Sequence, residues 1–264
     1  MKRMMSVAGA FYPAECGSIE SMIAQFNSIL DKAIEDQSYF SLKPRAIISP
    51  HAGYVYSGFT ANVAHRLLQN TAAKRVVVIG PSHRVYLSGI SGSFYDAFET
   101  PCGDLLIDTA YLEMLAQKFG IGFVPEAHQE HSTEVQMPFI HHYLPNTSVI
   151  ELVYGDVDPR NVAMICEEVL SDPHNVVVIS TDLSHYYPLS KAKELDMHCL
   201  QGVAELDITE LHNGCEACGK IGVEAIILAA KDLGLRPRIL DYRTSADASG
   251  DTSSVVGYMS AAFL

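Results

Sequence analysis

The segment Asn175-Val-Val-Val-Ile-Ser-Thr-Asp-Leu-Ser-His185 decides the fold, and two earlier segments, Arg45-Ala-Ile-Ile-Ser-Pro-His51 and Arg75-Val-Val-Val-Ile-Gly-Pro-Ser-His83, share its design. In each of them a short run of mostly β-branched residues stops abruptly, and a histidine follows within a few residues. Such runs are typical of strands that are buried on both faces of a parallel sheet. Ligands of open α/β sheets bind outside the carboxyl ends of the strands, so we expect the three histidines to converge there. Convergent imidazoles indicate a metal site.

The rest of the chain alternates helix and strand. Apolar residues recur at helical spacing after Ser18, which is placed to cap that helix, and Pro101-Cys-Gly-Asp104 predicts a turn in an antiparallel excursion over residues 88–108. No low-complexity linker interrupts the pattern, so we predict one α/β domain over residues 1–264, with a mixed, largely parallel central sheet flanked by helices. The expected strands are 45–49, 75–79, 148–153, 176–180, 237–243 and 254–263, and the expected helices are 18–37, 57–69, 109–119, 133–143, 159–171, 188–205 and 219–233.

Composition narrows the classes of function. The 264 residues include 18 basic and 31 acidic side chains, and the resulting formal charge of −13 disfavours nucleic acid and anionic membrane surfaces as partners. The first residues lack the apolar core of a signal peptide, and no apolar run approaches the length of a membrane span, so we expect a cytoplasmic protein. The six cysteines are scattered through a chain with ample material for a core, so we expect reduced thiols.

His51 and His83 are the first candidate metal ligands. Each follows a proline closely, in Ser-Pro-His and Gly-Pro-Ser-His. Proline ends the strand ladder and stiffens the loop that carries the imidazole. A single such histidine is explained by hydrogen bonds to loop carbonyls, whereas two in nearly identical frames favour a metal role.

The third ligand is open between a carboxylate and a thiolate. A two-histidine iron site is normally completed by a carboxylate, for which Asp182, Glu134 and Glu130 are available. A softer site would use Cys218, which precedes an apolar helix. There the positive end of the helix dipole is expected to lower the pKa of the thiol. No second Cys-x-x-Cys accompanies Cys215-Glu-Ala-Cys218, which disfavours a structural zinc knuckle.

Six ordered motifs span almost the whole chain: Ala8-Gly-Ala-Phe-Tyr-Pro13, Ser49-Pro-His-Ala-Gly-Tyr54, Ile79-Gly-Pro-Ser-His83, Glu130-His-Ser-Thr-Glu134, Ser180-Thr-Asp-Leu-Ser-His185 and Ala217-Cys-Gly-Lys220. Together they resemble the Memo family, whose prokaryotic members are called AmmeMemoRadiSam system protein B after accompanying AMMECR-type and radical-SAM proteins. The resemblance implies a fold similar to class III extradiol dioxygenases of the LigB type. It also implies one redox-active metal ion, iron or copper, and AMMECR-type and radical-SAM proteins as partners. The residues it implies are His51, His83 and Cys218 as metal ligands and Asp182 and His185 as polar residues of the same pocket.

The chain departs from this pattern at two places. Phe11 stands where the animal family has tryptophan, and this chain has no tryptophan at all, which argues against transferring peptide contacts that need an indole. Cys218 replaces the carboxylate that is usual in the dioxygenases. A sulfur ligand favours copper, zinc or thiolate-bound iron, and it argues against assuming ring cleavage.

Four further residues complete the candidate site. Asp182 and His185 follow a buried strand, where the carboxylate could accept a hydrogen bond from the imidazole and form a general acid/base pair. The alternative is that Asp182 caps the next turn and His185 lies at the surface. His131 and Glu134 would share one face of a helix start and could supply ligands or orient substrate, although Glu134 equally suits a capping box.

Phe11 and Tyr54 could wall the pocket, with the tyrosine hydroxyl donating to a bound oxygen, although aromatic residues are more often core. Five histidines have no supporting constellation and are assigned no role: His65, His128, His174, His198 and His212.

Three functions remain compatible with the sequence. The first is a metal-dependent, dioxygenase-like oxidoreductase in which His51, His83 and Cys218 hold the ion and Asp182 and His185 move protons. The second is a zinc hydrolase with the same ligands and His185 as base. The third is a non-catalytic, metal-stabilised module that binds an unknown small molecule or peptide, or serves a radical-SAM partner.

Overall fold

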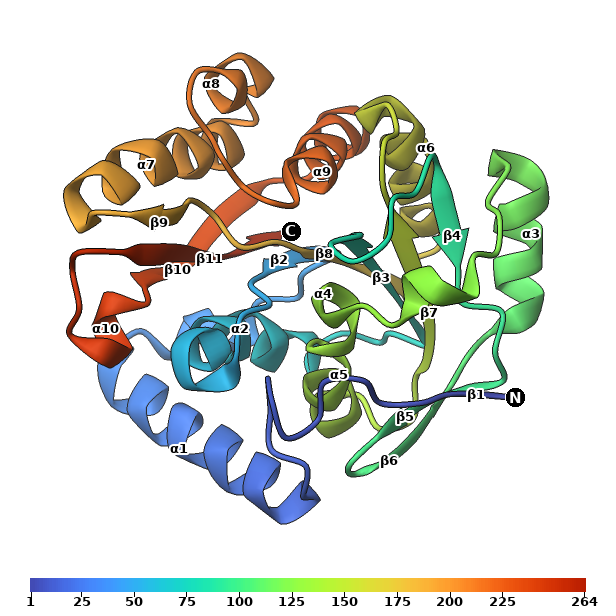
Figure 1. The fold of residues 1–264 in the computed structure, drawn as a ribbon, viewed down its shortest axis with the longest axis horizontal. Helices are drawn as coiled ribbons and strands as arrows, with labels where there is room; N and C mark the ends of the chain where they lie inside the picture. The colour runs from blue at the N-terminus through green and yellow to red at the C-terminus, as the bar shows by residue number, and fades with distance from the viewer.

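A central eight-stranded sheet organises the molecule, in a computed structural model that describes residues 1–264 (Figure 1). Its middle strands run parallel to one another, which confirms the mixed α/β sheet expected from the β-branched runs. In spatial order they are β2 (Ala46–Ser49), β8 (Asn175–Ser180), β3 (Arg75–Pro81) and β7 (Ser148–Tyr154).

Antiparallel strands border this parallel centre. On one side lie β11 (Val255–Phe263) and β10 (Pro237–Thr244), and on the other lies β4 (Ile90–Gly92). A short strand, β9 (His185–Tyr187), pairs with the beginning of β11. The path from β8 to β9 therefore lies beside the end of β2, which brings the segments after both strands to one edge of the sheet.

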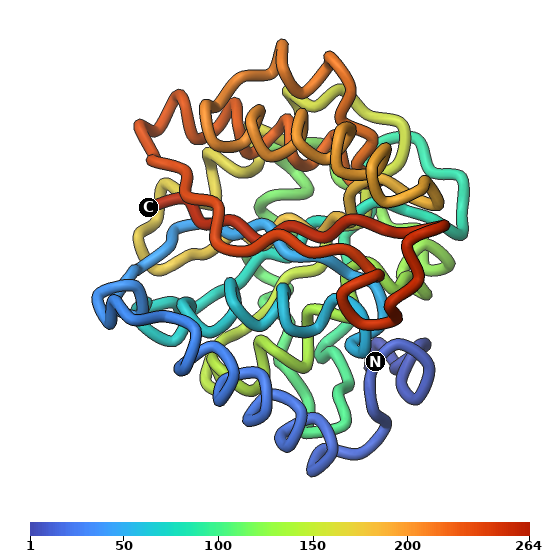
Figure 2. Tube along the Cα trace, turned by 90° about the vertical axis from the view of Figure 1, so that its left-hand side faces the viewer, coloured from blue at the N-terminus to red at the C-terminus, as the bar shows by residue number.

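Both faces of the sheet are buried, because alternate residues of each middle strand enter different hydrophobic clusters. In β3, Val77 and Ile79 belong to one cluster, whereas Val76 and Val78 belong to the other. Figure 2 shows the sheet between the two helical layers that these clusters join. The helices of the first layer are α3 (Thr109–Phe119), α6 (Pro159–Leu170), α7 (Leu189–Glu205), α8 (Ile208–His212) and α9 (Lys220–Leu233), and those of the second are α1 (Cys16–Ala33), α2 (Tyr54–Leu68) and α5 (Met137–Tyr143).

A second, three-stranded sheet supports the layer of α1, α2 and α5. The hairpin of β5 (Ala97–Thr100) and β6 (Gly103–Leu106) turns at Pro101 and Cys102, as predicted for the antiparallel excursion, and β1 (Lys2–Arg3) adds a parallel strand. The remaining short elements are α4 (His131–Glu134), α10 (Ala246–Ser249) and the 3-10 helices Gln37–Ser41 and Pro125–His128. No helix combines the length and the apolar content that a membrane crossing requires.

Three local expectations were wrong. The first helix begins at Cys16 after Glu15, which offers no side-chain cap, so Ser18 lies inside the helix. Helix α2 begins at Tyr54 rather than at residue 57. The helix expected over 133–143 is divided into α4 and α5, with a turn at Val135 and Gln136 just before Pro138, a residue that suits the first turn of a new helix.

The expectation of reduced cysteines was also wrong for four of them. Disulfides join Cys16 to Cys102 and Cys199 to Cys215, and the free cysteines are Cys166 and Cys218. Cys16 and Cys102 are 86 positions apart in the chain. They meet because the first residue of α1 lies at the turn of the β5–β6 hairpin, and only the tertiary structure reveals that contact.

Candidate metal centre

Three histidines from separate parts of the chain meet at the carboxyl edge of the parallel strands. His51 follows β2 and His83 follows β3, each two residues beyond the strand end. His131 is the first residue of α4, and one ring nitrogen of each histidine lies within 4.8 Å of those of the other two. The centroid of the His131 ring is 5.4 Å from that of His51 and 4.7 Å from that of His83. His185 does not belong to this group, because it lies on β9.

The ring of His51 is oriented by a buried chain of hydrogen bonds. Its Nδ1 is 2.9 Å from Oγ of Ser180, the last residue of β8. That hydroxyl donates its proton to the Ser132 carbonyl at 2.5 Å and accepts from Gln136 Nε2 at 2.8 Å. A hydroxyl has one proton, so Ser180 can only accept from His51, and Nδ1 of the neutral imidazole carries the hydrogen. The lone pair of the His51 ring therefore lies on Nε2.

One carboxylate orients the other two rings. Glu130 Oε1 is 3.1 Å from His83 Nδ1, with which it forms a hydrogen bond. The same oxygen is 2.8 Å from His131 Nδ1, but the angle of that contact does not suit a hydrogen bond. Glu130 Oε2 also accepts from the His83 amide at 2.7 Å. Burial opposes the negative charge of Glu130, but the contacts with His131 and His83 outweigh it and hold its pKa well below the usual range. An ionised carboxylate only accepts, so Nδ1 of His83 carries a hydrogen, and the Nε2 atom of that ring is the one that can bind a metal ion.

The donor set fits a first-row transition metal. Burial, and then the proximity of His83 and His131, lowers the pKa of His51 well below 6.5, so its imidazole is neutral near pH 7. Neutral imidazoles with oriented Nδ1 hydrogens are the ligands that iron, copper and zinc take in proteins. His51 is buried, whereas the His83 side chain is 29% exposed and opens the group to solvent.

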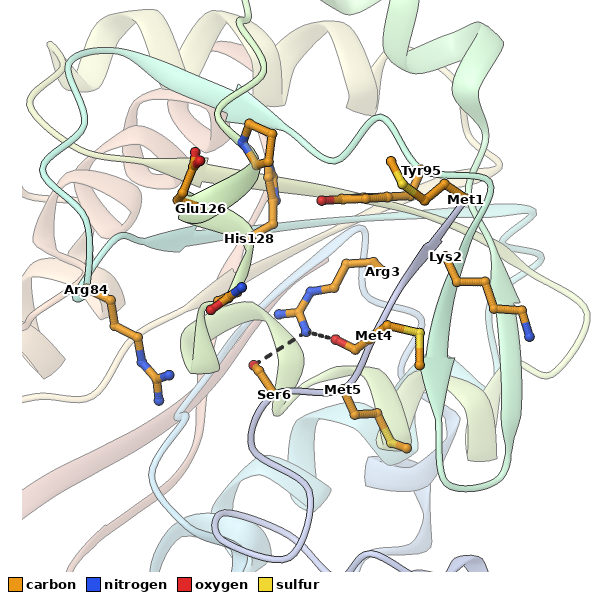
Figure 3. A pocket seen from close by; sticks show the side chains of 12 residues that line it. Met1, Lys2, Arg3, Met4, Met5, Ser6, Arg84, Tyr95, Glu126 and His128 are labelled. Atoms are coloured by element: carbon orange, nitrogen blue, oxygen red, sulfur yellow. Dashed lines mark hydrogen bonds between the residues drawn. The ribbon is translucent and has the colours of Figure 1, made fainter.

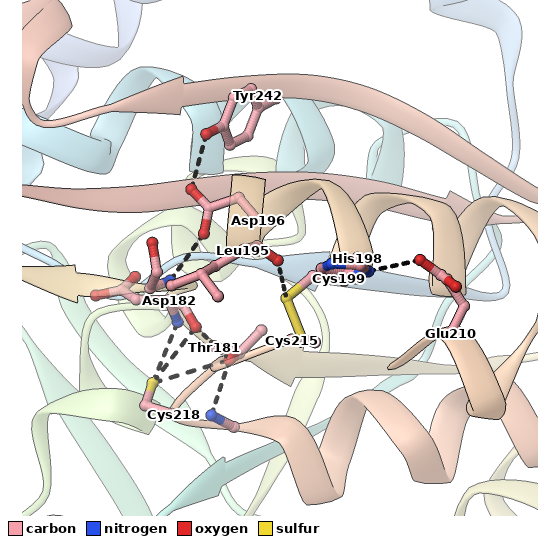
Figure 4. Close-up of a disulfide and its surroundings, with 12 residues drawn as sticks. Thr181, Asp182, Leu195, Asp196, His198, Cys199, Glu210, Cys215, Cys218 and Tyr242 are labelled. Carbon is pink, nitrogen blue, oxygen red and sulfur yellow. Dashed lines mark hydrogen bonds and ion pairs between the residues drawn. A yellow bond between two sulfur atoms is a disulfide. The ribbon is translucent and has the colours of Figure 1, made fainter. Parts of the chain in front are cut away.

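Cys218 lies beside this histidine group. Its Sγ is 3.3 Å from His51 Nε2, and it accepts from the Asp182 amide at 3.3 Å (Figure 4). The thiol comes just before α9, but the expected lowering of its pKa was wrong. Burial raises the pKa of Cys218 to about 12, and the nearby Asp182 carboxylate acts in the same direction. Without a metal the sulfur is thus a thiol, and a bound cation would have to displace its proton.

Asp182 and His185 are near each other in the chain, but the expected contact between them is not formed. Asp182 Oδ1 accepts from the backbone amide of His51 at 2.7 Å, and its side chain is buried. No hydrogen bond or ion pair joins it to the imidazole of His185, which is partly exposed on β9. Asp182 therefore fixes the loop that carries His51, and His185 lies at the solvent side.

The four residues expected to line the substrate pocket have different surroundings. His131 belongs to the histidine group, and the Phe11 ring packs against it with centroids 4.7 Å apart. Tyr54 is core, since its hydroxyl donates to the Val135 carbonyl at 2.9 Å and its ring is buried. Glu134 is fully buried and binds the N-terminal segment instead of facing the histidines.

A buried charged network lies on the other side of α4. Glu134 accepts from Arg3 Nη1 at 2.5 Å and from the Tyr12 hydroxyl at 2.8 Å. Glu151, in β7, accepts from Thr133 Oγ1 at 2.5 Å and lies 2.9 Å from His128 Nδ1. Arg3 and His128 line a cavity at the N-terminal segment (Figure 3), and its volume is about 610 Å³. We therefore assign His128 a structural role that its sequence context did not reveal.

A tyrosine-lined cavity of about 510 Å³ adjoins the residue after His51, and sequence reasoning missed it. Its walls include Ala52, Tyr56, Tyr186 and Tyr258. Burial raises the pKa of Tyr258, and the Asp182 carboxylate raises it further, which places this phenol near the candidate centre. The four residues belong to α2, β9, β11 and the loop after β2, so no local motif could have grouped them.

This chain is similar to known proteins over nearly its whole length. Residues 3–262 match the family model described as Memo, Memo-like protein. A MEMO1 family protein of Archaeoglobus fulgidus is 32% identical over 97% of this chain and 97% of its own length. A MEMO1 family protein of Aquifex aeolicus is 32% identical over 99% of both chains. A crystal structure of an uncharacterized protein from Escherichia coli K12 has a TM-score of 0.48 at 12% identity and covers 82% of this chain and 99% of its own.

Fold and site together define an α/β protein with a candidate histidine metal centre at the carboxyl edge of its parallel strands. The chain belongs to the Memo family, as its six ordered motifs predicted.

Proposed function

We propose that His51, His83 and Cys218, joined by His131, hold one redox-active metal ion, iron or copper, and that the protein is a metal-dependent, dioxygenase-like oxidoreductase. The observation that carries this proposal is the convergence of three imidazoles: Ser180 engages Nδ1 of His51, Glu130 engages Nδ1 of His83, and Nδ1 of His131 lies 2.8 Å from the same carboxylate. A structural cluster would use both nitrogens of each ring within the protein. Here the Nε2 atoms of His83 and His131 have no hydrogen-bond partner in the protein, and that of His51 faces only Cys218, which is itself a proposed ligand.

The surrounding residues have separate roles in this proposal. Iron or copper would supply one-electron chemistry toward dioxygen or a substrate oxygen. Asp182 holds the loop of His51, and Asp182 and His185 are the groups that we propose to move protons. A small aromatic or oxygen-rich molecule would approach through the tyrosine-lined cavity, where the phenols of Tyr56, Tyr186 and Tyr258 can donate to it.

The third histidine favours a second candidate function, metal-assisted hydrolysis. A set of three histidines is a known catalytic zinc site, and zinc would supply Lewis acidity without redox chemistry. His185, partly exposed beside the centre, would then act as the base. AMMECR-type and radical-SAM proteins remain the proposed partners in either case.

Metal analysis of anaerobically purified protein tests the centre. We expect one iron or copper ion per chain, and we expect its loss in His51→Ala and in Cys218→Ala. His174→Ala is the matched control, because His174 is an exposed histidine paired with Asp172 away from the group. Unchanged metal content in both site variants would refute the assignment.

Reconstitution separates the two candidate functions. Turnover of aromatic test substrates only with iron or copper and dioxygen supports the oxidoreductase, and ester hydrolysis with zinc alone supports the hydrolase. A charge-transfer absorption that disappears in Cys218→Ser would identify the sulfur as a ligand. Absence of that absorption in a metal-loaded wild-type protein would restrict the ligands to the three histidines.

A further inference from the structure

A second group of metal-ligating side chains lies on the opposite layer of the molecule, between helix α1 and the β5–β6 hairpin. One donor atom each of Cys16, Glu20 and Cys102 lies within 4.8 Å of the other two. In the oxidised chain the two sulfurs form a disulfide, with Cα atoms 4.7 Å apart. Cys16 and Cys102 are only partly buried and Glu20 is exposed, so a reductant and a cation can both reach them.

A histidine, His141, lies next to the turn that carries Cys102. Gly103 follows Cys102 in the hairpin turn and has a φ of +130°, and a Cβ atom there would come within 3.1 Å of His141 Nε2. The absence of a side chain thus lets the imidazole approach the turn that carries Cys102. Burial lowers the pKa of His141, and the Glu20 carboxylate partly opposes this effect, as it also does for His142.

The local structure suits negatively charged sulfur. Cys16 is the first residue of α1, an 18-residue helix whose N-cap residue provides no side-chain hydrogen bond and whose first turn has no acidic residue. That N-cap residue is Glu15, and because its carboxylate does not bind the first amides of the helix, the positive end of the helix dipole can act on Cys16 and favours a thiolate. Glu20 lies four residues later, on the same face of the helix.

We propose that reduction of the Cys16–Cys102 disulfide creates a zinc site in which Cys16, Cys102, Glu20 and His141 bind one Zn²⁺ ion. Two thiolates, one imidazole and one carboxylate are a donor set for tetrahedral zinc. The site is separate from the histidine group at the sheet edge and does not depend on the function proposed for it.

The conversion is balanced by a thiol reductant. Two thiol molecules of the reductant transfer two electrons and two protons: the S–S bond breaks, two S–H bonds form, and the reductant leaves as its own disulfide. Zn²⁺ then replaces both thiol protons, which pass to the solvent. The ion would replace the covalent link between α1 and the hairpin. The residues Ile19 and Ile23 of α1 would stay packed on the core in a reducing environment.

Zinc titration of oxidised and reduced protein tests the site, with a chromogenic chelator as competitor. The oxidised protein retains the histidine group and gives the baseline. We expect one additional Zn²⁺ per chain after reduction, with a matching rise in Tm and, for Co²⁺, a thiolate-to-metal absorption. The additional ion should disappear in Cys16→Ser and Cys102→Ser. It should remain in the double variant C199S/C215S, which lacks the other disulfide.

Two surface variants keep the test independent of folding. Glu20→Gln and His141→Gln remove a ligand without removing a disulfide and should weaken the additional site by about tenfold or more, a loss at least as large as that from an orienting partner. His142→Gln is the matched control, because it changes the neighbouring exposed imidazole. Equal zinc stoichiometry before and after reduction would overturn the proposal. So would an additional ion that survives Cys102→Ser or binds equally well in Glu20→Gln and His141→Gln.

Discussion

Two clusters of histidine and glutamate lie on either side of the four-residue helix α4. They differ in whether their polar atoms have hydrogen-bond or ion-pair partners within the protein. At its start, His131 joins a group of imidazoles in which the Nδ1 atoms of His51 and His83 are hydrogen-bonded and the Nε2 atoms of His83 and His131 have no hydrogen-bond partner. At its end, Glu134 enters a network with Arg3, in which charges neutralise one another. Both clusters contain histidine and glutamate, but only the network around Glu134 contains an arginine. The number of unused lone pairs separates the candidate binding site from the structural network.

The two clusters are also linked. Arg3 Nη2 donates to the backbone carbonyl of Glu130 at 3.1 Å, and the side chain of Glu130 touches His83 and His131. The satisfied network thereby holds the position of the residue that orients the imidazoles. The histidines of a metal site do not hydrogen-bond to one another, so neighbouring residues must hold their side chains in position.

Replacing Arg3 should cause the largest loss. The guanidinium is 3% exposed, and Arg3→Met would leave Glu134 and Glu151 buried with less compensation. Breaking a buried pair from one side costs about 3 to 5 kcal/mol, so we expect a decrease of that size in the free energy of unfolding. Urea denaturation measures it. Arg84→Met is the control, since Arg84 is exposed, and it should change stability by less than about 0.5 kcal/mol. Equal stability of the two variants would contradict the structural role of the network.

Glu130→Gln should affect metal binding more than folding. An amide cannot accept from His83 Nδ1, lie against His131 Nδ1 and accept from the His83 amide with the strength of a carboxylate. Loss of an orienting partner lowers metal affinity about 10- to 100-fold, which is about 1.4 to 2.8 kcal/mol of binding free energy. Competition against a chelator measures the change, with the exposed Glu126→Gln as control. An unchanged dissociation constant would show that Glu130 does not orient the ligands.

Much of the architecture followed from local patterns. The β-branched runs of β3 and β8 are buried on both faces, and such runs are recognisable without any distant contact. The convergence of His51 and His83 was predictable for the same reason, because both follow parallel strands. His131 was harder to place, since α4 has only four residues and is positioned by Arg3, which is 131 residues from Glu134 in the chain. The disulfides and the tyrosine-lined cavity likewise depend on contacts between remote segments.

Acid should weaken the charged network in a defined pH range. Burial disfavours the ionised form of Glu151, but the charges of His128 and Arg3 outweigh it and hold its pKa below the usual 4.5. The stabilisation is therefore complete above about pH 4.5 and is lost as the pH falls toward the lower pKa of the folded state. The slope from one proton is at most about 1.4 kcal/mol per pH unit. Urea denaturation between pH 7 and pH 3 measures the free energy of unfolding. Glu151→Gln should be less stable than the wild type at neutral pH and should lose less stability as the pH falls. If the free energies of both proteins fell in parallel with pH, Glu151 would be excluded as a source of the pH dependence.

Tyr54→Phe should have the smallest effect, and it tests where the boundary of the candidate centre lies. Tyr54 follows the His51 loop closely in sequence, but its hydroxyl donates to the Val135 carbonyl and its ring stacks on Phe139 with centroids 4.6 Å apart. Loss of one buried hydrogen bond costs about 0.5 to 1.5 kcal/mol, so we expect a decrease of that size in unfolding free energy with unchanged metal affinity. The same chelator competition and urea denaturation measure both quantities. A loss of metal with unchanged stability would place the phenol inside the centre and would make the loop after β2, rather than its histidine alone, part of the binding site.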